Sequence, residues 1–142
     1  MSVEFESGRR SQRGRAMEWL AVGVGGMLGA LGRYALSGWV HRLTDVSGFP
    51  LGTLVVNVVG CSVLGVLMQL VEQGRFASAP WRLFIAVGLL GSFTTFSTFG
   101  YETLELLRGG DGRWAALNLM GNLLLGVGAL FVGRLVVRGL VP

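Results

Sequence analysis

A run of hydroxyl-bearing and aromatic residues interrupts one of the apolar stretches of this chain. Residues 91–100 read GSFTTFSTFG, so five hydroxyl groups, two glycines and three phenylalanines fall within this run. A continuous helix would place Phe96 and Phe99 on one face, and Thr95 and Thr98 on another. An aromatic ring has a positive edge, so two rings turned edge-on can contact a small anion while hydroxyls replace part of its hydration shell. An ordinary packing pair of phenylalanines is the alternative that this spacing leaves open.

Four polar side chains lie within or beside other apolar stretches. Asn57 is in the middle of LGTLVVNVVGCSVLGVLMQLV, and Asn118 and Asn122 lie one helical turn apart. Polar groups inside a membrane are costly unless they are bonded, so each is a candidate for function. An amide can donate to an anion or join two helices, and Asn57 alone favours the second interpretation. Arg33 either extends to the membrane surface or raises the local anion concentration at a channel mouth.

Backbone breakers beside the hydroxyl run predict an interruption of the helix. Gly91 and Ser92 are followed by two threonines. Glycine weakens a helix, and hydroxyl groups compete for its backbone hydrogen bonds. We therefore expect a break near Gly91-Ser92. Breaks at membrane midplane depth recur where carbonyls and helix ends bind ions, so the residues indicate a polar-lined pathway with a helix break.

Composition indicates that the chain lies in a membrane. The 142 residues are 51% hydrophobic and 14% charged, with a mean hydropathy of +0.60, whereas a soluble domain has about 25% charged residues. Four apolar segments are each long enough to cross a bilayer as a helix, at 19–40, 51–71, 81–107 and 114–137. Short connections favour antiparallel neighbours, and small-residue pairs such as Gly25 and Gly29 favour close helix contacts. The sequence predicts an all-α integral membrane protein with four transmembrane helices, the third of them broken.

Residues 1–18 are polar and basic and precede a transmembrane domain over 19–138. They contain a cluster of four arginines: Arg9, Arg10, Arg13 and Arg15. We expect a retained, flexible tail that meets anionic lipid and not nucleic acid. Outside the tail the arginines divide four against four between the two membrane sides, so the positive-inside rule gives no firm orientation. Either the tail fixes the topology, or the core inserts in both orientations.

Three segments together resemble the signature segments of a known family. GGMLGALGRY in the first apolar segment, GTLVVNVVG in the second and GLLGSFTTFSTF in the third are similar, in order and spacing, to those of the CrcB/Fluc fluoride channels. The resemblance covers residues 20–138. It implies an antiparallel, dual-topology homodimer in the cell membrane, with two fluoride pores and a broken third helix in each protomer. The implied function is passive export of fluoride, which lowers fluoride in the cytoplasm.

The resemblance also implies roles for particular residues. Asn57 would donate a hydrogen bond to fluoride, and the ring edges of Phe96 and Phe99 would face the ion. Gly91 and Ser92 would supply backbone carbonyls to a structural Na⁺ at the dimer interface.

Other residues of the motifs would line the pathway or its entrance. Hydroxyl groups along the pathway would come from Thr95, Ser97 and Thr98. Arg33 matches the arginine that follows the first glycine-rich segment, at the vestibule. On the fourth helix the family often has Tyr and Ser where this chain has Asn118 and Asn122. We therefore expect these two amides to line the pathway in their place.

Two other classes of membrane protein remain open. A small four-helix dimeric antiporter needs a titratable residue deep in a span, and Glu102, toward the end of the third segment, is the acidic candidate. A non-transporting scaffold subunit would use the midspan amides to join its helices. The sequence contains no cysteine–histidine cluster, catalytic triad motif or phosphate-binding loop, so an enzyme is not expected.

Overall fold

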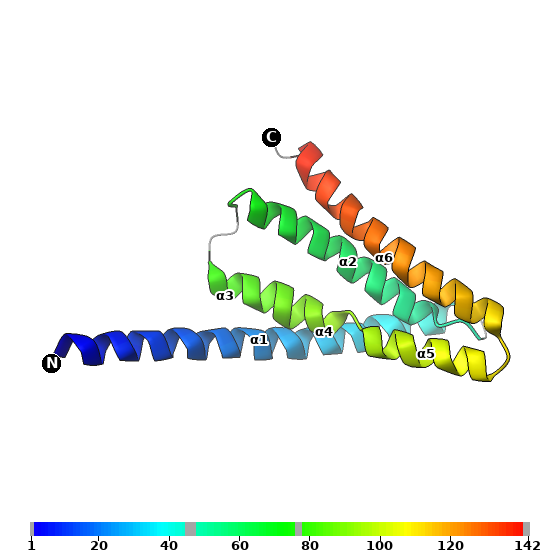
Figure 1. The fold of residues 1–142 in the computed structure, drawn as a ribbon, viewed down its shortest axis with the longest axis horizontal. Coiled ribbons are helices and arrows are strands. Elements are labelled where there is room, and N and C mark those ends of the chain that lie inside the picture. Colours follow the sequence, from blue (N-terminus) through cyan, green and yellow to red (C-terminus); the bar gives the residue numbers. More distant parts are fainter. Residues whose placement is uncertain (1, 45–47, 76–77, 141–142) are drawn as a thin grey trace.

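The computed structural model describes residues 2–44, 48–75 and 78–140, with side chains from residue 14 onward. The described elements are all helical (Figure 1). In chain order they are α1 (Ser2–Leu43), α2 (Leu51–Glu72), α3 (Ala79–Arg82), η1 (Leu83–Leu90), α4 (Gly91–Phe93), α5 (Phe96–Arg108) and α6 (Gly112–Leu140). Of these, η1 is a π-helix, a wide form that recurs at functional sites.

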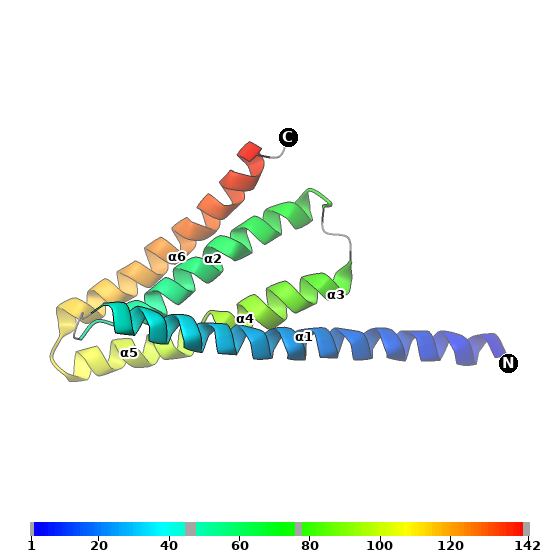
Figure 2. The ribbon, with the colours of Figure 1, turned by 180° about the vertical axis from the view of Figure 1, so that it is seen from behind.

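Four helical segments among the described residues are long and apolar enough to span a bilayer, as predicted. They cover Gly14–Leu43, Leu51–Glu72, Ala79–Arg108 and Gly112–Leu140. The main packing pairs are α1 with η1 and α2 with α6. Figure 1 shows these pairs meeting at the α5 end and diverging toward the N-terminal part of α1, and Figure 2 shows the same arrangement from behind.

Glycines let the paired helices approach until their backbones touch. A Cβ atom added to Gly29 on α1 would collide with the Leu89 carbonyl oxygen on η1. Between α2 and α6, a Cβ added to Gly65 would collide with the Leu130 carbonyl in the same way. The predicted small-residue faces are therefore confirmed, because only a residue without a side chain fits at these contacts.

The third span is interrupted at Thr94–Thr95, slightly later than the predicted Gly91-Ser92. Thr94 and Thr95 have extended backbone, with φ/ψ of −77°/153° and −147°/117°. Gly91 itself is helical, at −65°/−30°. The position is set by capping: the Thr95 hydroxyl accepts a hydrogen bond from the Thr98 N–H and so begins α5. The Thr95 hydroxyl bonds a backbone N–H at the start of α5, which glycine has no side chain to do. The break therefore lies at the threonine and not at the glycine.

A tight turn joins α5 to α6 and brings their facing residues together. Gly110 has a φ of +82°, which a residue with a side chain rarely adopts. The N–H groups of Gly110 and Asp111 donate to the Leu107 and Leu106 carbonyls, as in a Schellman motif. Because this turn is short, α6 runs back beside α5 and then along α2.

The basic N-terminal tail, predicted over 1–18, is helical in the structure from Ser2 onward. α1 begins at Ser2 and continues without a break into the first span. Figure 1 shows its N-terminal part projecting beyond the other helices. The tail contains no proline and is rich in Glu and Arg, which are good helix formers, so nothing in its sequence stops the helix at residue 18.

We predict that Gly29→Ala destabilises the folded protein by about 1–3 kcal/mol, because its methyl group overpacks the contact with η1. Gly23→Ala on the same helix is the matched control, since a Cβ there has no atom within 4 Å. The melting temperature of each variant in detergent is measured by heating samples and quantifying the protein that remains folded by size-exclusion chromatography. Equal melting temperatures for the two variants would contradict the close contact.

Candidate functional site

A cavity of about 220 Å³ lies at the break of the third span. It brings together Asn57 of α2, Thr95, Phe96 and Phe99 at the start of α5, and Asn122 of α6. Five of the predicted pathway residues therefore meet at one place. The remaining lining residues, which the sequence did not assign to the pathway, are Cys61, Thr94 and Leu123.

Asn57 satisfies the backbone that the break exposes. The Thr95 N–H donates to Asn57 Oδ1 at 2.9 Å, and Asn57 Nδ2 lies 3.4 Å from the Thr95 carbonyl. Asn57 Nδ2 also donates to Asn122 Oδ1 at 2.8 Å. A backbone N–H or C=O left without a partner in the membrane interior costs several kcal/mol of free energy. Asn57 therefore stabilises the break as well as facing the cavity.

Hydrogen bonds continue from Asn122 into the protein interior. Asn122 Nδ2 donates to Asn118 Oδ1 at 2.9 Å, and Asn118 Nδ2 donates to the Thr103 hydroxyl at 2.9 Å. The Thr103 hydroxyl donates in turn to the Phe99 carbonyl at 2.7 Å. Asn118 is 0% exposed and is absent from the cavity lining. The structure thus places Asn118 behind the cavity, whereas we expected it on the pathway surface, because its amide is bonded to the α5 side of the helix pair.

The two phenylalanines form an edge-to-face pair with different exposures. Their ring centroids are 5.5 Å apart, and the ring planes make an angle of 61°. Phe99 is 5% exposed, whereas Phe96 is 80% exposed on the outside of the protomer. One ring is therefore fixed in the core, while the other projects outward from the break.

The hydroxyl groups at the break bond to one another. Thr95 Oγ1 donates to Thr98 Oγ1 at 3.1 Å and lies 3.2 Å from Ser97 Oγ. Thr95 and Thr98 line a second cavity of about 100 Å³ together with Arg33, whereas Ser97 is exposed on the outer face. Thr95 lines both cavities, so it stands between them.

Arg33 extends toward the break and not only toward the membrane surface. Its Nε atom donates to the Ser92 carbonyl at 3.2 Å. A cation near the C-terminal end of a helical segment is favourable because the carbonyls there carry partial negative charge. The guanidinium also gives the second cavity a positive wall, which favours an anion over a cation there.

A third cavity of about 280 Å³ continues from Arg33 toward the connection between α1 and α2. It shares Tyr34, Ser37 and Thr53 with the Arg33 cavity, and it reaches Glu102. The Thr53 hydroxyl donates to Glu102 Oε1 at 2.7 Å. Sequence reasoning did not assign Thr53 or Tyr34 to the site. The spacing of Thr53, one helical turn before Asn57, was the available signal.

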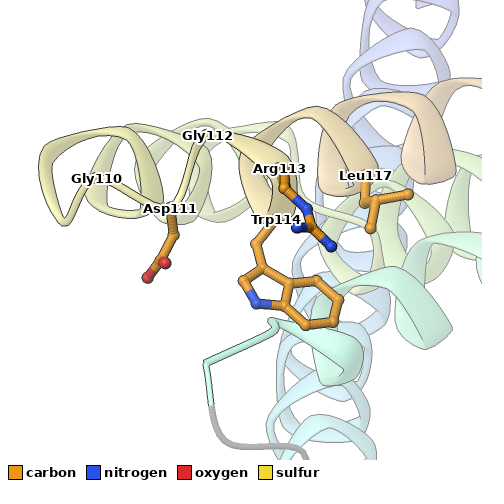
Figure 3. Close-up of a pocket in the computed structure, with 6 residues that line it drawn as sticks. All are labelled: Gly110, Asp111, Gly112, Arg113, Trp114 and Leu117. Atoms are coloured by element: carbon orange, nitrogen blue, oxygen red, sulfur yellow. The ribbon is translucent and has the colours of Figure 1, made fainter.

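The largest of these hollows lies away from the break. A cavity of about 690 Å³ is lined by the residues that Figure 3 labels, on the turn between α5 and α6 and the first turns of α6. Trp114 in this group packs against Phe49, with ring centroids 5.4 Å apart. None of the predicted pathway residues lines it, so size alone does not identify the candidate site.

Comparison with known proteins supplies the family. The family described as CrcB-like protein, Camphor Resistance (CrcB), matches residues 20–134. A protein of Thermus thermophilus named Fluoride-specific ion channel FluC is 46% identical, over 81% of this chain and 89% of its own length. Proteins of Oceanobacillus iheyensis (Fluoride-specific ion channel FluC) and Methanosarcina acetivorans (Fluoride-specific ion channel FluC 1) are 44% and 42% identical. The Oceanobacillus match covers 80% of this chain and 86% of that relative. The Methanosarcina match covers 82% of this chain and 87% of that relative.

The matched region contains the break, the cavity beside it and most of the four membrane-spanning segments. A chain with these segments is a multi-pass protein of the plasma membrane. It belongs to the CrcB-like protein family.

Proposed function

We propose that this protein is a fluoride-selective ion channel that lets F⁻ leave the cell down its electrochemical gradient, and that it is not an enzyme. The observation that carries the proposal is the cavity at the break, where the Asn57 amide meets the Phe96 and Phe99 rings inside an apolar bundle. The printed names of the relatives, Fluoride-specific ion channel, support the same function. Fluoride in equilibrium with HF explains the need: HF crosses lipid, ionises at neutral pH and is trapped inside as F⁻.

Passage of fluoride requires donors that replace its water without holding the ion. The Asn57 amide donates, the Thr95 and Thr98 hydroxyls can turn to donate, and the ring edges of Phe96 and Phe99 carry partial positive charge. The rings are weak ligands, so an ion that leaves the hydroxyls for the rings is stabilised but not trapped. Such a balance between entry and release is what conduction needs.

The route through one protomer follows the hollows that share lining residues. An anion enters beside Thr53 and Tyr34, meets the positive charge of Arg33, and passes Thr95 to reach the Asn57 cavity. Arg33 lines the smallest of these three hollows, about 100 Å³, and its charge concentrates anions there.

The channel is an antiparallel homodimer in which two copies insert in opposite orientations. At the depth of the break, Gly91, Phe96 and Ser97 are exposed on the outside of the protomer. Hydroxyl groups and irregular backbone are tolerated at this depth only where protein or a water-filled path covers them, so a second copy covers this face. The even division of arginines outside the tail supports insertion in both orientations.

Backbone carbonyls at the break would hold a structural Na⁺ between the two copies. The Gly91 carbonyl fits this role, because the N–H that would bond to it in an unbroken helix belongs to Thr95 and donates to Asn57 instead. Ser92 fits less well than its sequence position implied, since its carbonyl already accepts from Arg33, whose charge opposes a cation. When bound, the ion would supply a positive charge that both breaks share.

Proton-coupled antiport is the second candidate function, because of one observation at Glu102. Its Oε2 atom is buried, and no residue of the described chain bonds to it. A buried carboxyl group is what proton coupling requires. The channel is favoured because Glu102 lines the entrance cavity beside Thr53 and not the Asn57 cavity at the break, and its other oxygen is held by Thr53.

We expect Asn57→Asp to reduce fluoride efflux from proteoliposomes by about 10- to 150-fold, because a hydrogen bond to an ion is worth roughly 1.5–3 kcal/mol. The substitution keeps the side-chain shape and the acceptor for Thr95 but removes the donor. Phe96→Ile, which removes the ring edges, should act in the same direction. Val63→Ala, on the exposed face of α2, is the control. A wild-type efflux rate, measured with a fluoride electrode, in either test variant would place the pathway elsewhere.

We expect methyl methanethiosulfonate to inhibit efflux through Cys61, the single cysteine of the chain, because this thiol lines the Asn57 cavity. The added methylthio group occupies space that an ion needs. Cys61→Ser should conduct and resist the reagent, which excludes effects on the lipid. Full efflux after complete modification, verified by mass spectrometry, would show that the cavity is not on the route.

We expect efflux from the wild-type protein to require valinomycin, because a channel moves net charge and stops unless K⁺ leaves with F⁻. Glu102→Gln should keep this requirement. Valinomycin alone does not separate a channel from an antiporter, because F⁻ leaving as H⁺ enters also moves net charge. With the voltage clamped by valinomycin and equal K⁺ on both sides, an antiporter would take up fluoride against its gradient when the lumen is acidic, whereas a channel would not. Fluoride uptake driven by the pH gradient in the wild-type protein, and its loss in Glu102→Gln, would show that the protein is an antiporter and not a channel.

A further inference from the structure

We propose that Asn118, which is buried and does not line the Asn57 cavity, is a positioning residue that orients the Asn57 amide toward fluoride. This inference rests on the proposed channel function. It concerns the buried amide relay, which we define as Asn57, Asn122, Asn118 and Thr103. The relay connects the break on one side with the core of the α5–α6 pair on the other.

The relay has a single direction. The Thr95 N–H donates to Asn57, and Asn57 donates to Asn122, at 2.9 and 2.8 Å. Asn122 donates to Asn118, and Asn118 donates to Thr103, both at 2.9 Å. Each amide thus accepts through its oxygen and donates through its nitrogen, so the three side chains are aligned head to tail.

The fixed end of the relay is a backbone amide that can only donate. Turning Asn118 over would bring its nitrogen against the nitrogen of Asn122, and turning Asn122 to relieve this would pass the conflict on to Asn57. Turning Asn57 would finally bring its nitrogen against the Thr95 N–H. Two donors in contact are repulsive, so a reversal at any one member is opposed by all the others.

The direction matters because Asn57 Nδ2 carries two hydrogens. One is bound to Asn122 Oδ1 at 2.8 Å. The other faces the Thr95 carbonyl at 3.4 Å, which is near the limit of a hydrogen bond and is weak. This second hydrogen is the one that an anion in the cavity can take at small cost. Reversal of the amide would present the Asn57 oxygen to the anion, which would repel it.

Asn118 holds this arrangement from a position behind the cavity. It is 0% exposed, and Asn122 Nδ2 reaches both its side-chain oxygen and its backbone carbonyl, at 2.9 and 3.0 Å. Loss of the side chain would leave the Asn118 backbone carbonyl as the remaining acceptor for Asn122 Nδ2, so the free energy that keeps Asn122 in this direction falls. A reversed Asn122 would turn its nitrogen toward Asn57 Nδ2, and only the Thr95 N–H would then oppose reversal of Asn57.

Two substitutions far from the ion test the relay. Thr103→Val keeps the shape of Thr103 but removes the acceptor for Asn118, and Asn118→Leu removes the middle of the relay. We expect each to raise the half-saturating fluoride concentration about tenfold, the effect of one lost neutral hydrogen bond, while the maximal efflux rate changes less. The double variant should be no worse than the worse single variant, because the relay is already interrupted. Thr103→Ser, which retains the hydroxyl, should restore the wild-type concentration.

The measurement is efflux rate against fluoride concentration, with the dimer population of each sample determined by size-exclusion chromatography. Wild-type half-saturation in folded Thr103→Val would overturn the inference, and so would equal impairment in Thr103→Ser, which would assign the effect to shape. Thr103→Val decides the matter if Asn118→Leu does not fold. Absence of fluoride efflux from the wild-type protein would instead overturn the channel function itself.

Discussion

The hydrogen bond from the Thr95 backbone amide to the Asn57 side chain is the interaction on which the candidate site depends. An interrupted helix inside a membrane leaves backbone donors and acceptors that neither water nor lipid can satisfy. Asn57 satisfies the donor of Thr95, and the Thr95 hydroxyl caps the helix that follows. The break is therefore stable because a polar side chain from another span reaches it, and the same side chain is left facing a cavity.

That hydrogen bond in turn depends on close packing between spans. The Asn57 amide is short, so α2 must lie near the break. A Cβ added to Gly60, one turn beyond Asn57, would collide with the Thr94 side chain, so glycine at this position lets α2 approach. Gly29 and Gly65 do the same for the other helix pairs. Small residues thus bring the polar groups within bonding distance, and without a side chain they add no competing contact.

The polar groups of the site divide into an inner set and an outer set. Asn118, Asn122 and Thr103 are bonded to one another inside the protomer. Phe96 and Ser97 project outward at the same depth, where lipid is a poor neighbour for a hydroxyl group. The Asn57 cavity lies between the two sets. The cavity therefore has bonded amides on one side and exposed groups on the other.

Much of this protein could be predicted from its sequence, because the constraints of a membrane are strong and local. The length of the apolar segments determined the four spans, glycine spacing determined the helix contacts, and the run of hydroxyls around Phe96 determined that the third span breaks. The position of the break at Thr94–Thr95 depended on capping geometry. Only the tertiary structure decided that Asn118 is buried behind Asn122, that Arg33 reaches the Ser92 carbonyl, and that Thr53 bonds Glu102. These contacts join residues far apart in the sequence, and periodicity states only the face on which a side chain lies, not the partner that it meets there.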